Sequence, residues 1–349
     1  MSKTIINRMG GRLLTVALSL TLALSQCLQV LAQEEPSATY EEYLSGENRG
    51  QTDAALYEVI RIASVEQLQE LAAACCYDEW SRDKRVILEA DLDLNGGTVE
   101  IPVFGGIFDG QGHTISGLEI RRDGSQTGLF RYLQQGAVVQ ELTVTQARVL
   151  PQGSGCQAGI LAGKNYCSIV NCRVSGVLEG EEEVGGIAGV NEDSGVIRSC
   201  TAEVTVLGNR RSGGIAGSNH GTINNCVNRG NINIYTNDMV YELEDFTVEN
   251  LEETSSGTRL DAHMDTGGIA GISDGKIYYC SNEGTVGYAH VGYNTGGIVG
   301  RLHQGYIQNC TNTGHVLGRK DVGGIAGQME PFMEVEYIDG KLDELDREL

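Results

Sequence analysis

The pentapeptide GGIAG stands at residues 185–189 and returns at 213–217, 267–271 and 323–327, with GGIVG at 296–300. Two adjacent glycines ordinarily weaken a strand or a helix, because glycine loses more conformational freedom on folding than any other residue. The repeated pair therefore indicates a backbone position that every copy must satisfy. Either a positive φ or a close approach of two backbones, which a side chain would obstruct, fits this description.

The copies recur at a nearly fixed period. With the related GILAG at 159–163 included, the spacing of the first glycines is nearly constant, except that the interval between Gly213 and Gly267 is about twice as long as the others. A second motif, Gly-x-Ile-x-x-Cys, follows in the same phase. Its copies span 195–200, 221–226, 275–280 and 305–310, with an earlier variant at 167–172, and the last three add Asn228, Asn282 and Asn312 after the cysteine. Two motifs in phase at this period are typical of a stacked repeat array.

The segments between the glycines are only four to seven residues long and are rich in Ile, Val, Thr and Asn. Three such strands per circuit predict an all-β fold, a right-handed parallel β-helix of about seven coils. Successive coils of this solenoid would lie about 4.8 Å apart, so that like residues stack. The expected inward ladders are Ile187, Ile215, Ile269, Ile298 and Ile325, and Ile197, Ile223, Ile277 and Ile307.

These motifs resemble the GLUG-motif repeats of secreted and surface proteins of Gram-positive bacteria, which also occur beside immunoglobulin A metallopeptidase domains. The resemblance extends over about residues 84–331 and includes FGGIFDGQGHTISGL at 104–118 and GLF at 128–130. It implies the β-helix architecture and a secreted or surface location. It brings no catalytic residue with it.

Residues 1–32 have the order of a secretory signal peptide. Three basic residues precede the apolar run at 13–24, and small residues lead to a predicted cleavage after Ala32. An uncleaved anchor, or a lipid on Cys27, is the alternative. Removal of residues 1–32 takes away three basic and no acidic residues, so the formal net charge changes from −22 to −25. Such a charge repels nucleic acid and anionic lipid, so we expect neither nucleic acid as a partner nor insertion into a membrane.

The long interval between Gly213 and Gly267 holds an acidic segment without a glycine pair. We expect an inserted loop at about residues 235–264, the alternative being a degenerate coil. With an inserted loop, Arg211 and Asp265 lie on adjacent coils, and Arg211 lies between the carboxylates of Glu183 and Asp265. A loop of this kind either carries binding residues or is a solvated decoration.

Residues 33–83 are predicted to form a polar lead followed by a cap over the first coil. SVEQLQELAAACC, starting at Ser64, predicts an amphipathic helix in which Ser64 and Gln67 form a capping box. Such a lid is expected because the terminal strand of a solenoid otherwise exposes unpaired backbone groups. The apolar face comprises Leu68, Leu71, Ala72 and Cys75.

Two further segments flank the repeats. The alternation in VILEADLDLNG at 86–96 predicts one strand with Asp91, Asp93 and Asn95 on one face. These oxygen atoms would either bind calcium or form the solvated face of an edge strand. At the other end, residues 332–349 predict a strand and then the start of a helix at 341–349, which either docks as a cap or continues into a longer protein.

Ten cysteines in a secreted chain raise the question of disulfides. Five share one repeat position and would stack about 4.8 Å apart, whereas the Cβ atoms of a disulfide lie about 3.8 Å apart. We therefore expect small buried apolar side chains at these positions, with Cys156 and Cys167 as the pair to be considered if a disulfide forms. The five are Cys172, Cys200, Cys226, Cys280 and Cys310.

Catalytic motifs are missing or explained by the repeat. None of the 6 histidines is followed by glutamate, so the zinc-protease motif HExxH is absent. GISDG at 271–275 matches the nucleophile elbow G-x-S-x-G, but its glycines end one repeat motif and begin the next, so Ser273 is not assigned as a nucleophile. An enzyme of the β-helix type would use charged residues of neighbouring coils. The candidates are Asp109, His113, Arg210, Arg211, Lys320 and Asp321.

The sequence thus predicts a non-catalytic secreted or cell-surface β-helix, with no catalytic, cofactor-binding or metal-binding residue assigned. Its surface would serve adhesion, the binding of an extracellular glycan or of a host or matrix protein, or spacing. The alternatives are a carbohydrate-active lyase or hydrolase of the β-helix type and an accessory segment of a larger surface protein.

Overall fold

The computed structural model describes residues 57–122, 124–151, 156–234 and 263–330, together with the backbone at 337–338 and 341–342. The predicted signal peptide, the predicted polar lead before residue 57 and nearly all of the predicted insert lie outside the described residues. The part from Glu58 onward is one compact unit.

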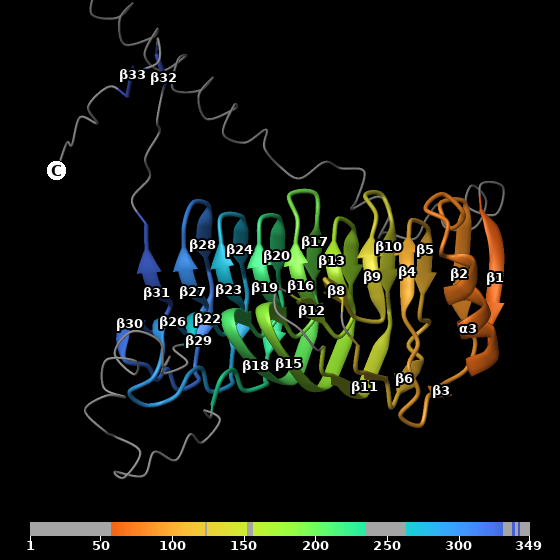
Figure 1. The fold of residues 1–349 in the computed structure, drawn as a ribbon, viewed down its shortest axis with the longest axis horizontal. Helices are drawn as coiled ribbons and strands as arrows, with labels where there is room; N and C mark the ends of the chain where they lie inside the picture. Colours follow the sequence, from red (N-terminus) through yellow and green to blue (C-terminus); the bar gives the residue numbers. More distant parts are fainter. Residues whose placement is uncertain are drawn as a thin grey trace, which may run out of the picture. The chain divides into compact units, whose positions relative to one another are not determined.

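Three sheets run side by side along this unit, and the chain visits them in turn, once per coil (Figure 1). Every pairing between successive coils is parallel, which confirms the predicted parallel β-helix. One of the three sheets, called sheet C below, contains eight strands, so the solenoid has eight coils where about seven were predicted. The additional coil belongs to the opening segment, whose glycine pairs at 96–97 and 105–106 are not part of a GGIAG motif.

The first two sheets consist mainly of three- and four-residue strands. Sheet A comprises β1 (Glu58–Ile62), β2 (Lys84–Leu88), β5 (Ile107–Asp109), β10 (Val138–Gln140), β14 (Ser168–Val170), β17 (Val196–Arg198), β20 (Thr222–Asn224), β24 (Lys276–Tyr278) and β28 (Tyr306–Gln308). Sheet C comprises β4 (Ile101–Phe104), β9 (Phe130–Leu133), β13 (Ala162–Asn165), β16 (Ala188–Asn191), β19 (Ala216–Asn219), β23 (Ala270–Ser273), β27 (Val299–Leu302) and β31 (Ala326–Met329).

Sheet B contains 14 strands because most coils contribute two segments to it. They are β3 (Leu92–Asp93), β6 (Thr114–Ser116), β7 (Glu119–Ile120), β8 (Gln126–Thr127), β11 (Thr143–Val149), β12 (Gln157–Gly159), β15 (Arg173–Gly185), β18 (Thr201–Gly213), β21 (Val227–Asn228), β22 (Met264–Gly267), β25 (Ser281–Asn282), β26 (Tyr293–Gly296), β29 (Thr311–Asn312) and β30 (Lys320–Gly323).

The repeated isoleucines form the interior, as predicted. Ile187, Ile215, Ile269 and Ile298 are completely buried, and the second ladder stacks in register from Ile197 through Ile223 and Ile277. Ile325 is 41% exposed because it stands on the last described coil. Each interior isoleucine is therefore covered by the coils on its two sides. Its side chain is buried only because the neighbouring coils stack on it.

The glycine pairs serve close approach and not a positive φ. A Cβ on Gly213 would lie 2.0 Å from the carbonyl oxygen of Ala216, and none of the GGIAG glycines has a positive φ. The left-handed conformation falls instead two residues earlier, where Glu183 has a φ of +53° and Arg211 a φ of +56°. Of the two explanations that the sequence allowed for the glycine pair, steric exclusion is the correct one.

The N-terminal cap is confirmed. Helix α3 (Val65–Ala74) begins at the N-cap Ser64, whose hydroxyl accepts a hydrogen bond from the backbone of Gln67, and it buries Leu68 and Leu71. Strand β1, which precedes the helix and pairs in parallel with β2, was not predicted. The first edge of sheet A is therefore a strand, and α3 closes the interior of the first coil.

Two segment predictions at the ends differ from the structure. The single strand at 86–96 is wrong, because β2 ends at Leu88 and β3 begins at Leu92, with a corner between sheets A and B in between. Alternation of polar and apolar residues continues through this corner, so the pattern alone does not reveal it. Strands β32 (Tyr337–Ile338) and β33 (Lys341–Leu342) pair antiparallel, so β33 stands where the start of a helix was expected, whereas β32 begins at the end of the predicted strand. The remainder of that helix lies outside the described residues.

The coils on the two sides of the acidic segment are direct neighbours. Strand β18 pairs with β22, with Arg210 opposite Met264 and Ser212 opposite Thr266, so Arg211 and Asp265 are in register. Strands β19 and β20 pair in the same way with β23 and β24. The predicted adjacency of Arg211 and Asp265 is therefore confirmed, and the chain leaves and re-enters the solenoid between two stacked coils.

Candidate functional site

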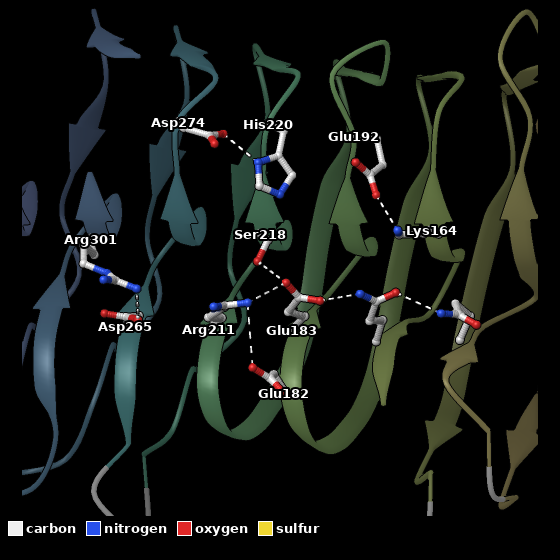
Figure 2. A network of polar contacts seen from close by, with 12 residues as sticks. Lys164, Glu182, Glu183, Glu192, Arg211, Ser218, His220, Asp265, Asp274 and Arg301 are labelled. Atoms are coloured by element: carbon white, nitrogen blue, oxygen red, sulfur yellow. Dashed lines mark hydrogen bonds and ion pairs between the residues drawn. The ribbon is translucent and has the colours of Figure 1, made fainter. Parts of the chain in front are cut away.

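A row of polar side chains follows the corner between sheets B and C, at the position two residues before each glycine pair. We call this row the corner ladder (Figure 2). Its later members adopt a positive φ, from +53° at Glu183 to +57° at Asp265, which aims successive side chains in the same direction. The register of β12, β15, β18, β22, β26 and β30 stacks them. The members are Gln126, Gln157, Glu183, Arg211, Asp265, Asn294 and Asp321.

Glu183 is the centre of the first half of the corner ladder. Its Oε1 atom accepts hydrogen bonds from Arg211 Nη1 and from the Ser218 hydroxyl, each at 2.9 Å, and its Oε2 atom accepts one from Gln157 Nε2. Gln157 in turn accepts from Gln126 at 3.1 Å. The carboxylate is only 9% exposed, and both of its oxygens are occupied by donors from neighbouring coils.

Asp265 is the centre of the second half. Asn294 Nδ2 donates to its Oδ1 at 2.7 Å, and Arg301 Nη2 donates to its Oδ2 at 3.0 Å. Arg301 also binds Glu330 at 2.8 Å, and hydrogen bonds from His303 and Arg301 hold the pKa of Glu330 below its usual value. Asp265 is 5% exposed, so this carboxylate too is buried together with its partners.

Arg211 forms ion pairs on one side only. Its Nη1 atom lies 2.9 Å from Glu183 and 3.7 Å from Glu182, both on the preceding coil. Asp265, on the following coil, pairs with Arg301. The expectation that Arg211 lies between two carboxylates thus holds for the register but not for the ion pairs, because Arg301 offers Asp265 a nearer partner.

Further charge pairs bridge adjacent coils in the turns beyond sheet C (Figure 2). Lys164 Nζ lies 2.6 Å from Glu192, and this hydrogen bond raises the pKa of Lys164. His220 Nδ1 lies 2.7 Å from Asp274. These contacts repeat the arrangement of the corner ladder: a carboxylate on one coil lies against a nitrogen atom of the neighbouring coil, and such cross-strand pairs stabilise a sheet.

The residues considered for catalysis are not brought together. Asp109 is buried and binds Arg85 at 3.0 Å, whereas His113 lies 3.2 Å from Asp91. Arg211 belongs to the corner ladder, and Arg210 is exposed on β18. Lys320 and Asp321 stand on β30, at the opposite end of the solenoid from Asp109 on β5. These six side chains therefore do not form one cluster.

Ser273 and the repeated asparagines have structural positions that the sequence did not reveal. Ser273 is 1% exposed and accepts a hydrogen bond from Asn219 Nδ2 at 3.0 Å, which agrees with its rejection as a nucleophile. It ends a buried ladder in which the amide of each asparagine donates to the next, through Asn165, Asn191 and Asn219. A second ladder of this kind joins Asn228, Asn282 and Asn312.

The stacked cysteines are buried thiols. Burial raises the pKa of Cys172, Cys200 and Cys226 well above the usual value, so these thiols stay protonated and are poor nucleophiles. The backbone N–H of Cys172 donates to the sulfur of Cys200 at 3.4 Å, which continues the in-register stack. The structure holds no disulfide between Cys156 and Cys167; the Sγ atom of Cys156 donates to the carbonyl oxygen of Gly124.

The calcium alternative at the first strands is not supported by the contacts. Asp91 Oδ1 accepts from the Thr114 backbone at 2.8 Å, and Asp93 Oδ1 accepts from the Asn95 backbone at 2.9 Å. Across the ranges that the structure describes, no group of three or more His, Cys, Asp or Glu side chains is arranged to hold a metal ion. The aspartates instead satisfy backbone donors at the corner.

The comparisons agree with this architecture. Residues 180–207 match the family model described as the GLUG motif, so the chain carries this repeat. A crystal structure of a candidate immunoglobulin A1 protease from Bacteroides ovatus has the same fold, with a TM-score of 0.51 and 19% identity over 78% of this chain and 84% of that chain. The resemblance to GLUG-motif proteins is thereby confirmed, and at this identity the crystal structure establishes the fold alone.

One curated relative is similar in sequence. Halomucin from Haloquadratum walsbyi is 30% identical over 171 residues, which are 44% of this chain and 2% of halomucin. The chain therefore spans only a small fraction of the length of this relative. Among the described helices, none has the length and apolar character required to cross a membrane.

Proposed function

We propose that the protein is a non-catalytic, secreted or cell-surface β-helix whose long faces bind an extracellular glycan or a host or matrix protein. The observation that carries this proposal is the state of the buried carboxylates. Glu183 and Asp265 each have both oxygens engaged by donors from adjacent coils. A general acid or base must exchange a proton with a substrate, and a carboxylate locked in this way serves the stack instead.

The rigidity of the stacked coils supports the same proposal. Isoleucine, asparagine and cysteine ladders link each coil to its neighbours in one register. Binding residues on such a scaffold hold fixed spacings, which reduces the ordering cost of association. The signal-peptide order of residues 1–32 and the similarity to a protein named halomucin support a location outside the cell.

An accessory segment of a larger surface protein is the second candidate. It is favoured by one observation: in halomucin the similar region is 2% of a much longer chain. A β-helix of this kind would then serve as one module among many. Both candidates predict binding or spacing without turnover.

Binding and turnover can be measured on the same preparation. The mature chain, residues 33–349, is applied to a glycan array and to immobilised matrix proteins, and is incubated with acidic polysaccharides in a reducing-sugar assay. We expect saturable binding and no release of sugar ends. Asp109→Asn and His113→Gln are the informative variants, and Asp193→Asn, an exposed turn position, is the matched control.

Release of sugar ends by the parent chain that disappears in either of the first two variants and persists in the control would make the protein an enzyme. Absence of binding to every glycan and protein offered would remove the binding role and leave spacing. Thermal unfolding of each variant shows whether a lost signal reflects a lost fold.

A further inference from the structure

Three tyrosines gather on the outer face of sheet A, where its last described coils stack. The register of β24 and β28 places Lys276 beside Tyr306 and Tyr278 beside Gln308, while Tyr279 follows β24 at the corner. Tyr279 is 58% exposed and Tyr306 is 45% exposed. We call Tyr278, Tyr279, Tyr306 and Lys276 the tyrosine platform.

The rings of the platform hold each other in place. The centroids of Tyr278 and Tyr279 lie 5.8 Å apart with an interplanar angle of 77°, which is the edge-to-face arrangement that aromatic pairs prefer. The Lys276 Nζ atom lies 5.9 Å from the centroid of the Tyr306 ring, within the range of a cation–π contact. The platform is therefore an ordered array of aromatic rings with one ammonium group.

Tyr279 adopts a conformation that is unfavourable for a bulky residue. Its φ is +57°, the left-handed conformation that asparagine tolerates and large side chains avoid. The equivalent corners after β14, β17, β20 and β28 carry the smaller Asn171, Ser199, Asn225 and Asn309 at nearly the same φ, and the corner after β10 carries Glu141. Burial does not compensate for the tyrosine, because most of its surface is exposed. A strained residue kept without burial is evidence for a role in binding.

The charge of this face differs from that of the whole chain. The formal net charge of the protein is −22. From β10 to β28, however, the two outward residues of each described strand of sheet A include Arg198 and Lys276 and no aspartate or glutamate. An anionic ligand that the rest of the surface repels thus finds no carboxylate at these strand positions, and the nearest corner with one is that of Glu141 after β10.

We propose that the tyrosine platform binds an acidic polysaccharide, one that contains uronate or sulfated sugars. This inference rests on the proposed glycan-binding function and assigns its site and ligand class. Apolar faces of pyranose rings stack on tyrosine rings, the exposed amide of Gln308 and the tyrosine hydroxyls offer hydrogen bonds, and Lys276 pairs with the carboxylate or sulfate group. The coil spacing of about 4.8 Å is close to the length of one sugar unit, so successive sugars of a chain running along the solenoid would contact β24 and then β28.

Other ligands fit the platform less well. Single-stranded nucleic acid also stacks on aromatic rings, but its binding depends on an extended positively charged groove, and the platform has one ammonium group. A stable protein partner usually buries about 800 Å² on each side with an apolar centre, whereas the platform alternates aromatic rings with amide and ammonium groups.

The test uses the mature chain with hyaluronan oligosaccharides and heparin as acidic probes and dextran as the neutral probe. The platform variant carries Tyr279→Asn and Tyr306→Ser, and the matched control is Tyr77→Ser, since Tyr77 is 75% exposed near the cap helix. We expect the parent to bind at least one acidic probe and not dextran. The platform variant should lose about tenfold or more in affinity while the control keeps it. Lys276→Gln should weaken binding and flatten its dependence on salt.

Tyr279→Asn restores the residue type of the other corners, so it should keep or raise the thermal midpoint, and a folding defect would not explain lost binding. Equal affinities of the platform variant and the control would contradict the site while leaving the glycan-binding function intact. If the parent bound only dextran-like neutral glycans, single-stranded DNA or a matrix protein, the ligand class would be wrong. If the parent bound nothing, the platform proposal would fall together with the binding function.

Discussion

At the scale of single residues, the fold depends on positions where no side chain fits. A Cβ on Gly214 would lie 2.3 Å from Asn228 Cγ and 2.3 Å from the carbonyl oxygen of Gly268 on the next coil. The equivalent Gly324, on the last described coil, has nothing within 4 Å of that point. The second glycine of the motif thus excludes a side chain at Gly214 but not at Gly324, and the related GILAG segment carries the buried Ile160 at this position.

This contrast gives the first prediction. Gly214→Ala should destabilise the protein by about 2 to 3 kcal/mol, because backbone and an asparagine of the buried ladder must both move. Gly324→Ala should change stability by less than about 0.5 kcal/mol. Urea unfolding of the two variants measures both. Similar losses for both would mean that the glycine is required by its own conformation and not by the neighbouring coil.

At the scale of elements, the ladders determine which strands pair. The corner ladder joins β15 to β18 through Glu183 and Arg211, and β22 to β26 through Asp265 and Asn294. A slip of one residue between coils would place Glu183 opposite Arg210 or Ser212 instead of Arg211 and break these hydrogen bonds. The ladder therefore specifies register as well as adding stability.

The pair Glu183 and Arg211 can be tested by a double-mutant cycle. Glu183→Gln should cost about 1 to 3 kcal/mol, because it removes the charge that Arg211 faces and leaves donors unsatisfied. Arg211→Met should cost less in the Glu183→Gln background than in the parent, by a coupling energy of about 1 kcal/mol. Strictly additive losses in chemical denaturation would show that the two side chains act independently.

The buried cysteines of the ladder predict how the stability of the protein depends on pH. The thiols of Cys172, Cys200 and Cys226 have a raised pKa in the folded state because they are buried, so unfolding lowers it. Their contribution to stability is then complete below the ordinary thiol pKa of about 8.5 and declines as pH rises above it. We expect the unfolding midpoint to fall in alkaline buffer, and Cys200→Ala with Cys226→Ala to reduce that fall.

Labelling with iodoacetamide at pH 8 gives a direct measurement of the same burial. Cys76 is exposed and should react in the native protein, whereas the buried Cys172, Cys200 and Cys226 should react only after denaturation. Rapid native labelling of Cys200 or Cys226, located by peptide mass mapping, would show that the coils separate readily.

At the scale of the whole molecule, two coils stack directly on each other even though a long acidic segment separates them in the sequence. Coils on both sides of the acidic segment pair directly, and Asn233 Nδ2 donates to Thr266 Oγ1 at 3.1 Å across that junction. The contacts that hold the coils together therefore do not depend on the residues between them.

Replacing residues 236–261 by a short glycine-serine linker should leave stability unchanged or slightly raised, since a shorter loop costs less entropy on closure. Thermal unfolding and circular dichroism of the shortened chain provide the measurement. A large loss of stability would assign the segment a structural role. The same variant, applied to the glycan and matrix arrays, shows whether the segment carries binding residues.

Much of this architecture follows from the sequence because the glycine pairs and the isoleucines recur in phase along the stack. The corner after Leu88 could not be predicted, since the alternation of polar and apolar residues continues through it. Strand β1 could not be predicted because its five residues are recognised as a strand only by their pairing with β2. The tyrosine platform was hidden for a related reason. Tyr279 and Tyr306 are far apart in the chain, and only the register of β24 and β28 brings their coils together.

The direction of the hydrogen bonds has a mechanical consequence. Bonds between successive coils, such as those from Ile269 to Ile298 and from Ile298 to Ile325, run along the axis of the stack. A pull on its two ends would therefore load the bonds between one pair of coils before the next, and the rod would lengthen in discrete steps. An attachment built in this way would yield gradually under shear, releasing one turn of chain at a time while the remaining turns stay intact.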